Sequence, residues 1–555
     1  MKKLMKRGVM PLLAFGAVAL LSVSCGGTKV VDTDLKNLDA KITWWNNYQK
    51  PEINDKLTEE EARKQSKYNE YYYALDLIKE FNKTYPNIEV ETTFKGNYAA
   101  IQQAVNTGLN GGVVPNIATC YGDHVAGYNK VGATLDMTPY LTDEKMGLGK
   151  TMNENAEVVD DPTTAMDDLN MSYFDAEKNM YASKQYLSLP YSKSGEMLSF
   201  NQDVFDKVGA GEAGKANGTY VAPVSLASKV AYSVPTNYKD LISTARKMKA
   251  DYPSLFSDAN QKDANGFFKN IPFCYDSGEN MFISFSQMMN IPYTKADGSV
   301  AEQILFKNDD AKKLVVQLKK WNNEGLMCTQ NQLPFSDSQG KYHEYSSNMF
   351  VKGNIFMCIT STTGARYFAA DSGFKASLVS TPVIDTNCYD GASGTVTTAK
   401  SKVLSQGPSL TFFKKSGDNA KQNDASWLFY KFLTDSNNTA KLSVNTSYFP
   451  LRKSAYESEG IKKLTSAAET GVTTDSSYNE KVSCYGGTSL KLNESYTNDN
   501  RYFISPVFDR SASTRTAVGG LIESIFNNAN LKDDAAITTA VDAAFEAAYA
   551  AAVNG

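Results

Sequence analysis

The residues of this sequence that offer specific chemistry are suited to holding a ligand. Trp45 ends one short β-like run and Asn46 follows it, and Tyr121 ends another run, with Asp123 shortly after it. A flat ring with a polar tip can grip a ligand that is half apolar, while amides and carboxylates supply hydrogen bonds. Neighbouring strand residues face opposite sides, so we expect only one of Trp44 and Trp45 to face a ligand.

The sequence offers few residues for metal binding, catalysis or nucleotide binding. Only His124 and His343 are present, which leaves little material for a zinc site or for a Ser-His-Asp triad. The segment 209–216 (GAGEAGKA) satisfies G-x-G-x-x-G, but a nucleotide-binding loop must follow a strand and open a helix. Here a helix-like segment precedes it and no helical period follows it. We therefore interpret it as a surface loop, and we expect no catalytic residue, metal or cofactor.

The strand ends are positioned by an alternation of strands and helices. Strand-like runs at 42–45, 88–94 and 117–121 are separated by helical patterns at 71–81 and 98–109. This order predicts an α/β fold with a mainly parallel sheet and right-handed crossovers. In such sheets ligands gather at the carboxyl ends of the strands. Both candidate groups lie at these ends.

Helical periodicity continues in the rest of the chain. Further amphipathic helices are expected at 236–248, 312–321, 426–433 and 533–548. Trp321 and Trp427 lie on two of these helices, and we expect both to be core residues.

The composition narrows the class of protein. The chain of 555 residues has room for more than one domain or one large two-lobed body, and its net charge of -4 with 21% charged residues argues against a nucleic-acid partner. Beyond Cys25 six cysteines are widely spaced without a C-x-x-C pair. We expect free cysteines buried in apolar strands rather than a disulfide framework.

The N-terminus has the layout of a secretory signal: basic residues, then an apolar run at 9–21, then small residues. The run is shorter than the ~20 residues that span a bilayer. Cys25 after the small residues resembles the lipobox of bacterial lipoproteins, although Ser22 stands where leucine is usual. We predict a signal peptide at 1–24 and a lipidated tether at 25–39, acylated on Cys25. An ordinary cleaved signal with an incidental cysteine is the alternative.

Several ordered motifs resemble family 1 extracellular solute-binding proteins, the sugar-capturing subunits of ABC importers. The first is LPYSKSGEMLSFNQDVFDKVG at 189–209, with a Leu-Pro-x-Ser, an aromatic-Asn strand end and a helix ending at Gly. The others follow in order along the chain: KVGATLDMTPYL (130–141), VPTNYKDL (234–241), MFVKGNIFMCI (349–359), LSQGPSLTFFKKS (404–416), YFPLRKSAY (448–456) and ISPVFDRSASTRTAV (504–518).

The resemblance implies a two-lobed fold of the type II periplasmic-binding-protein kind. Each lobe would be a mainly parallel sheet flanked by helices, and hinge crossovers would join the lobes. The first lobe would contain 40–189 and 402–449, and the second 193–398 and 452–555. Ligand would bind in the interlobe cleft, where contact with both lobes favours the closed state.

Strand-end positions and the family likeness together nominate the ligand contacts. Aromatic rings would stack on sugar faces, and polar groups would pair with hydroxyls, since an unpaired buried polar group costs about 1–3 kcal/mol. The candidates are Trp44, Trp45, Asn46, Tyr121, Asp123, Tyr191, Ser194, Glu196, Asp276, Ser361, Thr362, Gly364 and Arg366.

The expected function is capture of a sugar or oligosaccharide for delivery to ABC permease subunits. The protein would be a monomer in the cell envelope, held to the membrane by its lipid alone. A secreted glycan-active enzyme and a surface adhesion or sensor protein are the alternatives. An enzyme would show two carboxylates facing each other across the cleft at about 5–10 Å, and an adhesin would lack a small-molecule cleft.

Overall fold

The computed structural model describes residues 35, 37–50, 70–153, 155, 157–207, 214–216, 219–221, 231–336, 340, 343–369, 373–397, 401–473 and 475–555. Cys25, the predicted signal peptide and most of the tether lie outside the described residues. The segment 51–69 and most of 208–230 lie outside them too.

The first of two five-stranded sheets has the order β2-β1-β3-β15-β6. Its strands are β1 (Ala40–Asn46), β2 (Ile88–Phe94), β3 (Ile117–Cys120), β6 (Ser188–Pro190) and β15 (Ser409–Phe412). β1 runs parallel to both β2 and β3, whereas β15 is antiparallel to β3 and to β6. The expected strand-helix order of the first 120 residues is confirmed, with α2 (Glu70–Thr84) and α3 (Tyr98–Gly111) between the strands.

The second sheet repeats this arrangement with the order β11-β10-β12-β7-β13. Its strands are β7 (Glu196–Asn201), β10 (Ile271–Tyr275), β11 (Met327–Thr329), β12 (Ile355–Ser361) and β13 (Ala376–Val379). β10 is parallel to β11 and β12, and β7 is antiparallel to β12 and β13. In each sheet the antiparallel strand occupies the fourth place and directly follows a chain crossing from the other sheet.

Three crossing segments lie side by side between the two sheets. Lys193 bridges to Phe449, and Ser194 bridges to Gln406. At Gly407, φ is +90°, and an added Cβ would lie 1.8 Å from the Ser192 carbonyl oxygen. Only glycine fits there, so the crossings form a closely packed hinge.

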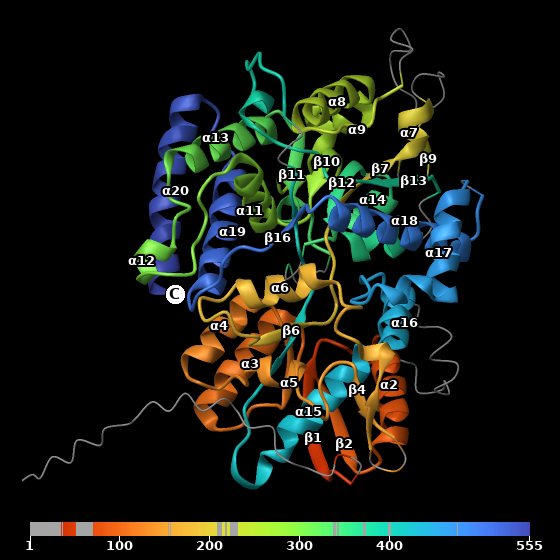
Figure 1. The fold of residues 1–555 in the computed structure, drawn as a ribbon. Coiled ribbons are helices and arrows are strands. Elements are labelled where there is room, and N and C mark those ends of the chain that lie inside the picture. Colours follow the sequence, from red (N-terminus) through yellow and green to blue (C-terminus); the bar gives the residue numbers. More distant parts are fainter. Residues whose placement is uncertain are drawn as a thin grey trace, which may run out of the picture.

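Helices cover both sheets, and Figure 1 shows the two bodies one above the other. Around the first sheet lie α2, α3, α4 (Gly122–Lys130), α5 (Thr138–Leu141), α6 (Met171–Asn179), α15 (Lys421–Leu433) and α16 (Ser436–Thr446). The second body contains α7 (Gln202–Lys207), α8 (Tyr238–Asp251), α9 (Pro253–Phe256), α10 (Asp258–Gln261), α11 (Gly278–Met289), α12 (Val300–Gln303), α13 (Asp309–Asn323), α14 (Ser346–Val351), α17 (Glu459–Thr470), α18 (Tyr478–Asn498), α19 (Ser511–Asn527) and α20 (Asp534–Asn554).

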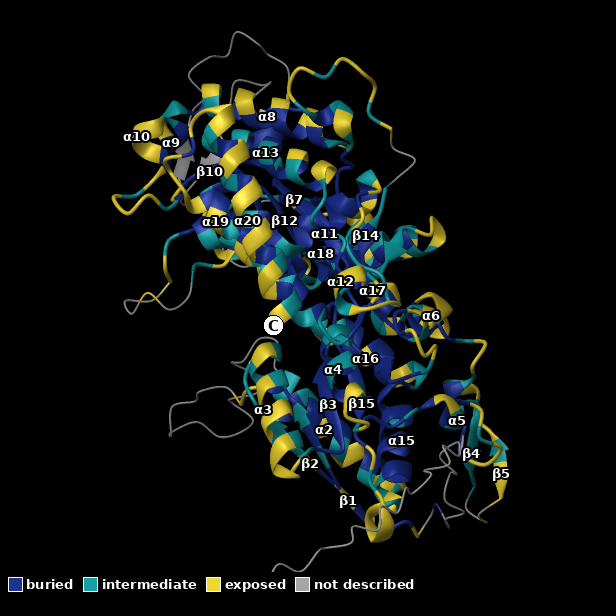
Figure 2. Ribbon diagram, turned by 90° about the vertical axis from the view of Figure 1, so that its left-hand side faces the viewer, coloured by how far each residue is buried: buried dark blue, intermediate teal, exposed yellow. Residues whose placement is uncertain are grey.

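The two bodies have separate hydrophobic cores, visible as buried ribbon in Figure 2. Trp44 and Trp427 are fully buried in the first, and Trp321 is fully buried in the second, so the core placement of Trp321 and Trp427 is confirmed. Trp45 points away from Trp44 and is half-buried. The six described cysteines are free and buried.

Helix α20 is, among the described helices, the one long and apolar enough to span a membrane. Its Ile537, Val541 and Phe545 are buried in the second core. A salt bridge of 2.8 Å joins Lys312 of α13 to Asp542 on its outer side. In this structure α20 therefore packs as a helix of the second body.

Candidate functional site

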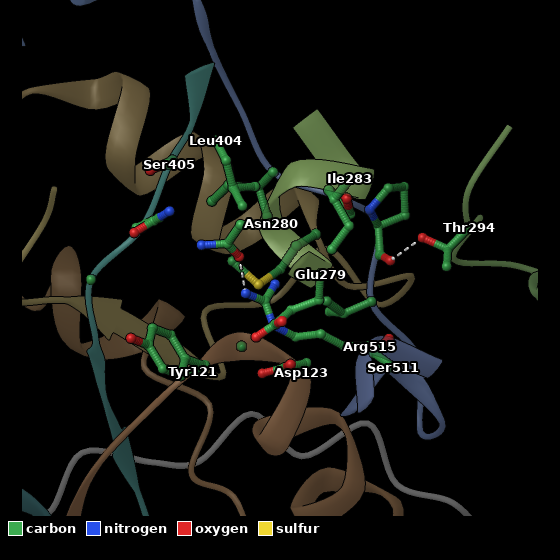
Figure 3. A pocket seen from close by; sticks show the side chains of 18 of the residues that line it. Tyr121, Asp123, Glu279, Asn280, Ile283, Thr294, Leu404, Ser405, Ser511 and Arg515 are labelled. Atoms are coloured by element: carbon green, nitrogen blue, oxygen red, sulfur yellow. Dashed lines mark hydrogen bonds between the residues drawn. The ribbon is translucent and has the colours of Figure 1, made fainter. Parts of the chain in front are cut away.

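A cavity of about 350 Å³ lies between the two bodies. Figure 3 shows side chains from both bodies around it. Its lining comprises Tyr121, Gly122, Asp123, Glu177, Met180, Lys193, Ser277, Glu279, Asn280, Ile283, Tyr293, Thr294, Leu404, Ser405, Gln406, Gly407, Ser409, Ile504, Ser505, Pro506, Val507, Ser511 and Arg515. The cavity thus touches the first body, the second body and two crossing segments.

Two helices point their N-termini at the cavity from opposite sides. α4 starts directly after β3, with Tyr121 at its N-cap, and α11 starts after β10, with Ser277 at its N-cap. The Ser277 hydroxyl accepts a hydrogen bond of 3.1 Å from the Asn280 backbone N–H. The unpaired N–H groups and the dipole of a helix start favour electron-rich ligand atoms.

Charged side chains of both bodies meet in the cavity. Asp123 comes from α4, Glu279 from α11 and Arg515 from α19, and the guanidinium of Arg515 also donates a hydrogen bond to the side-chain oxygen of Asn280. Burial lowers the pKa of Arg515, but Asp123 and Glu279 raise it above its ordinary value. Arg515 therefore stays charged. Together these side chains can donate hydrogen bonds to, and accept them from, a ligand with several hydroxyls.

The wall toward the hinge contains a buried ion pair. The Lys193 ammonium lies 2.6 Å from a Glu177 carboxylate oxygen, and these side chains are 4% and 1% exposed. Lys193 also donates to the Ser409 hydroxyl at 2.9 Å, and the Ser188 hydroxyl donates to Glu177 at 2.6 Å. The pair joins α6 to a crossing segment.

A second buried carboxylate, Glu196, lies behind the cavity. It accepts hydrogen bonds from the Tyr275 hydroxyl at 2.7 Å, the Ser284 hydroxyl at 3.2 Å and the Gln406 amide at 2.9 Å. Burial raises the pKa of Glu196 to about 7. Because Gln406 lines the cavity, Glu196 orients a residue that faces the ligand space.

Aromatic residues continue from the cavity along the first body. The Tyr121 ring packs edge-on against Tyr98 with centroids 4.7 Å apart, and Tyr98 shares a hydrogen bond with Tyr448. Trp45 packs in the same cluster and carries the Lys95 ammonium 4.2 Å from its ring centroid. These rings offer flat surfaces beside the charged groups.

The structure brings two of the thirteen nominated ligand contacts, Tyr121 and Asp123, into the cavity lining. Trp45 belongs to the adjoining aromatic cluster. Asp276 directly follows β10 and Ser361 ends β12; both are partly exposed, but they do not line the cavity. For all thirteen residues ligand contact stays a prediction.

Other nominated residues on the first sheet are fully enclosed by protein. Trp44 donates through its indole N–H to the Thr119 hydroxyl at 2.9 Å and packs edge-on against Tyr191 with centroids 6.0 Å apart. Asn46 donates to the Thr92 hydroxyl at 2.6 Å. Trp44 packs against Phe429 of helix α15, and Tyr191, just after β6, belongs to the same core.

The remaining nominated residues lie in the hinge and beside it. Ser194 pairs with a neighbouring crossing, Glu196 holds Gln406, and Thr362 accepts a hydrogen bond of 3.1 Å from the Gly195 N–H. Arg366 donates to the Ser447 hydroxyl at 2.7 Å, and Gly364 is buried on the same 3₁₀ helix. None of the five lines the cavity.

Several cavity residues were not nominated from the sequence, although some carried a signal. Ser277, Glu279 and Asn280 follow Asp276 directly, so the strand-end argument needed only to extend into the first turn of α11. Gln406 and Arg515 lie within the motifs 404–416 and 504–518, but nothing in those motifs shows which side chain faces inward.

Solved structures with a similar fold cover nearly the whole chain. UgpB from Mycobacterium tuberculosis in complex with glycerophosphocholine has a TM-score of 0.57 at 13% identity, over 92% of this chain and 98% of that one. The cyclic alpha-maltosyl-1,6-maltose binding protein from Arthrobacter globiformis has a TM-score of 0.56 at 12% identity, over 93% of this chain and 100% of that one. An ABC substrate-binding protein from Listeria monocytogenes in complex with cycloalternan has a TM-score of 0.56 at 14% identity, over 92% of this chain and 98% of that one.

No curated protein sequence matches the chain significantly. The sequence profile of the bacterial extracellular solute-binding proteins, by contrast, matches residues 76–469. This match spans parts of both sheets and all three crossing segments. The two-lobed architecture and the extended profile match lead to one conclusion: the chain belongs to the bacterial extracellular solute-binding protein family.

Proposed function

We propose that the protein is the substrate-binding lipoprotein of an ABC import system, which captures a sugar or oligosaccharide between its lobes and delivers it to a membrane permease. The observation that carries this proposal is the cavity shared by both bodies, with the carboxylates of Asp123 and Glu279 and the guanidinium of Arg515 beside the ring of Tyr121. A ligand held there contacts both lobes only when they are close, so binding favours closure.

The charge arrangement favours a neutral polyhydroxy ligand. Two carboxylates accept hydrogen bonds from hydroxyls, and the guanidinium donates to hydroxyl oxygens. An anionic ligand would meet both Asp123 and Glu279, which already offset the charge of Arg515. Similar folds with carbohydrate ligands, such as cycloalternan, support this choice.

The envelope location and the anchor belong to the same proposal. The signal pattern at 1–24 and the lipobox-like Cys25 support a protein tethered by acyl chains to the outer face of the cytoplasmic membrane or in the periplasm. The proposed state of the tethered protein is a monomer. The lobes would divide at the crossings, giving 40–189 with 402–449 and 193–398 with 452–555.

A glycan-active enzyme is the second candidate, favoured by Asp123 and Glu279 on opposite walls of the cavity. Glycosidases work with two carboxyl groups placed across the scissile bond. Incubating the purified protein with oligosaccharides that it binds separates the two: a receptor returns them intact, and an enzyme releases shorter products.

Isothermal titration calorimetry and thermal shift with mono- and oligosaccharides test the proposal. A ligand at 100 times its Kd stabilises the fold by about 2.7 kcal/mol. Arg515→Ala is expected to abolish the shift. The control Arg246→Ala, at a 41% exposed ion pair on α8, keeps it. Stabilisation by peptides or polyamines, with none by carbohydrates, would overturn the carbohydrate assignment.

A further inference from the structure

We propose, resting on the proposed function, that the ligand is an extended oligosaccharide whose distal sugar units bind in a second cavity between α3 and α19. This cavity has a volume of about 600 Å³. Its walls come from α3, α19 and the end of α20, which lie across from one another in Figure 2.

The second cavity continues both walls of the first. α19 lines the first cavity through Ser511 and Arg515 and the second through Ala512, Ser513 and Thr516. On the other side, α3 begins at Tyr98, whose ring packs against Tyr121 of the first cavity. A chain held at Arg515 therefore meets the α3–α19 space next.

The α3 wall carries amides and no charge. Gln102, Gln103, Asn106 and Asn110 all line the cavity. Gln103, Asn106 and Asn110 are three and four residues apart and share one helix face, and Gln102 lies four residues before Asn106. None of these four side chains hydrogen-bonds to another described group. The whole of α3 (YAAIQQAVNTGLNG) lacks Asp, Glu, Lys and Arg, although the outer face of a surface helix ordinarily carries charges.

The chemistry of this surface matches a neutral hydroxylated chain. Each amide presents both a donor and an acceptor, which suits hydroxyl groups, while an apolar ligand would leave these groups unpaired. Across the cavity, Ala512, Ser513 and Ala517 have small side chains, which leave room for sugar rings. The first cavity binds and orients one end of the ligand, and the second adds affinity for ligands long enough to reach it.

The alternative occupant of this space is the protein itself. If the lobes closed so that α3 packed directly on α19, the amides would stabilise the closed state whatever the ligand. The two possibilities differ in how the effect of an α3 substitution depends on ligand length.

The test is calorimetry with maltose and maltohexaose, and with cellobiose and cellohexaose, on the full folded chain. In the wild type the hexasaccharide of the accepted series is expected to bind at least about tenfold more tightly than the disaccharide. The double variant Gln102→Ala/Asn106→Ala is expected to lose about tenfold for the hexasaccharide and less than twofold for the disaccharide. Gln287→Ala/Asn437→Ala, which removes two exposed amides outside both cavities, is expected to change neither, and thermal melts verify folding.

Equal losses for short and long ligands would overturn the inference in favour of direct lobe packing. Equal wild-type affinity for both lengths would overturn it while the proposed function stands. Binding of neither series at any length would overturn the inference together with the carbohydrate assignment.

Discussion

Two buried carboxylates lie beside the same crossing segment, Glu177 on α6 and Glu196 at the start of β7, and their surroundings differ. Glu177 meets the Lys193 ammonium at 2.6 Å, whereas the hydrogen-bond donors to Glu196 are all neutral. Burial raises the pKa of Glu196 to about 7. The hinge therefore contains one carboxylate whose charge is compensated by Lys193 and one acid that titrates near neutral pH.

The Glu177–Lys193 pair is a structural link, whereas the stability that Glu196 contributes depends on pH. A buried pair is worth little relative to an apolar pair, but removing one partner leaves an uncompensated charge. Glu196 avoids that cost by taking up a proton. Its neighbours act in both directions, since Arg515 lowers its pKa while burial raises it.

The largest expected effect is at the ion pair. Lys193→Met leaves Glu177 charged and unpaired, and we expect a loss of about 3–5 kcal/mol in the free energy of unfolding, measured by urea denaturation. The double variant Glu177→Gln/Lys193→Met is expected to regain most of it. A loss below about 1 kcal/mol in the single variant would show that the two buried carboxylates do not differ in this way.

The next effect is a pH dependence specific to Glu196. Its folded pKa of about 7 exceeds the unfolded value near 4.5, so the folded state binds the extra proton between these values. The associated stability is fully present below pH 4.5 and is lost as pH rises toward 7. The total is on the order of 3 kcal/mol.

Denaturation of wild type and Glu196→Gln across pH 4 to 8 measures this pH-dependent contribution of Glu196 to stability. The variant is expected to be less pH-dependent, so the difference between the two curves isolates Glu196 from other acids. Parallel curves would mean that Glu196 does not titrate between pH 4.5 and 7.

A smaller effect is expected at Gln406, which connects Glu196 to the cavity. Gln406→Leu removes one donor to a buried carboxyl group, and we expect about 1–3 kcal/mol of destabilisation together with weaker carbohydrate binding. Thermal melts and calorimetry on one preparation measure both. Unchanged affinity alongside lowered stability would show that Gln406 stabilises the hinge but does not contribute to ligand binding.

The sequence predicted the architecture better than the individual contacts. Strand-helix alternation predicted the first sheet, because the hydrophobic periods of 2 and 3.6 are local properties. The resemblance of the ordered motifs to a known family implied the second sheet. Ligand contacts depend on which side chains face inward at a crossing. Trp44 and Trp45 show the limit: alternation separates them, but only packing against α15 shows that Trp44 is the one in the core.

Long-range placement accounts for the residues that sequence reasoning missed. Arg515 lines the same cavity as Asp123 although nearly 400 positions separate them in the chain, and no local pattern marks it. Glu196 and Arg366 looked like ligand groups from their polarity after predicted strands or within the family motifs. In the structure their partners are Tyr275 and Gln406 for Glu196, and Ser447 for Arg366.

Closure of two lobes on a carbohydrate is the central claim, and small-angle X-ray scattering measures it most directly. With an oligosaccharide shown by calorimetry to saturate the protein, the radius of gyration is expected to fall relative to the free protein, and Arg515→Ala is expected to keep the free value. An unchanged radius of gyration for the saturated wild type would contradict capture by closure.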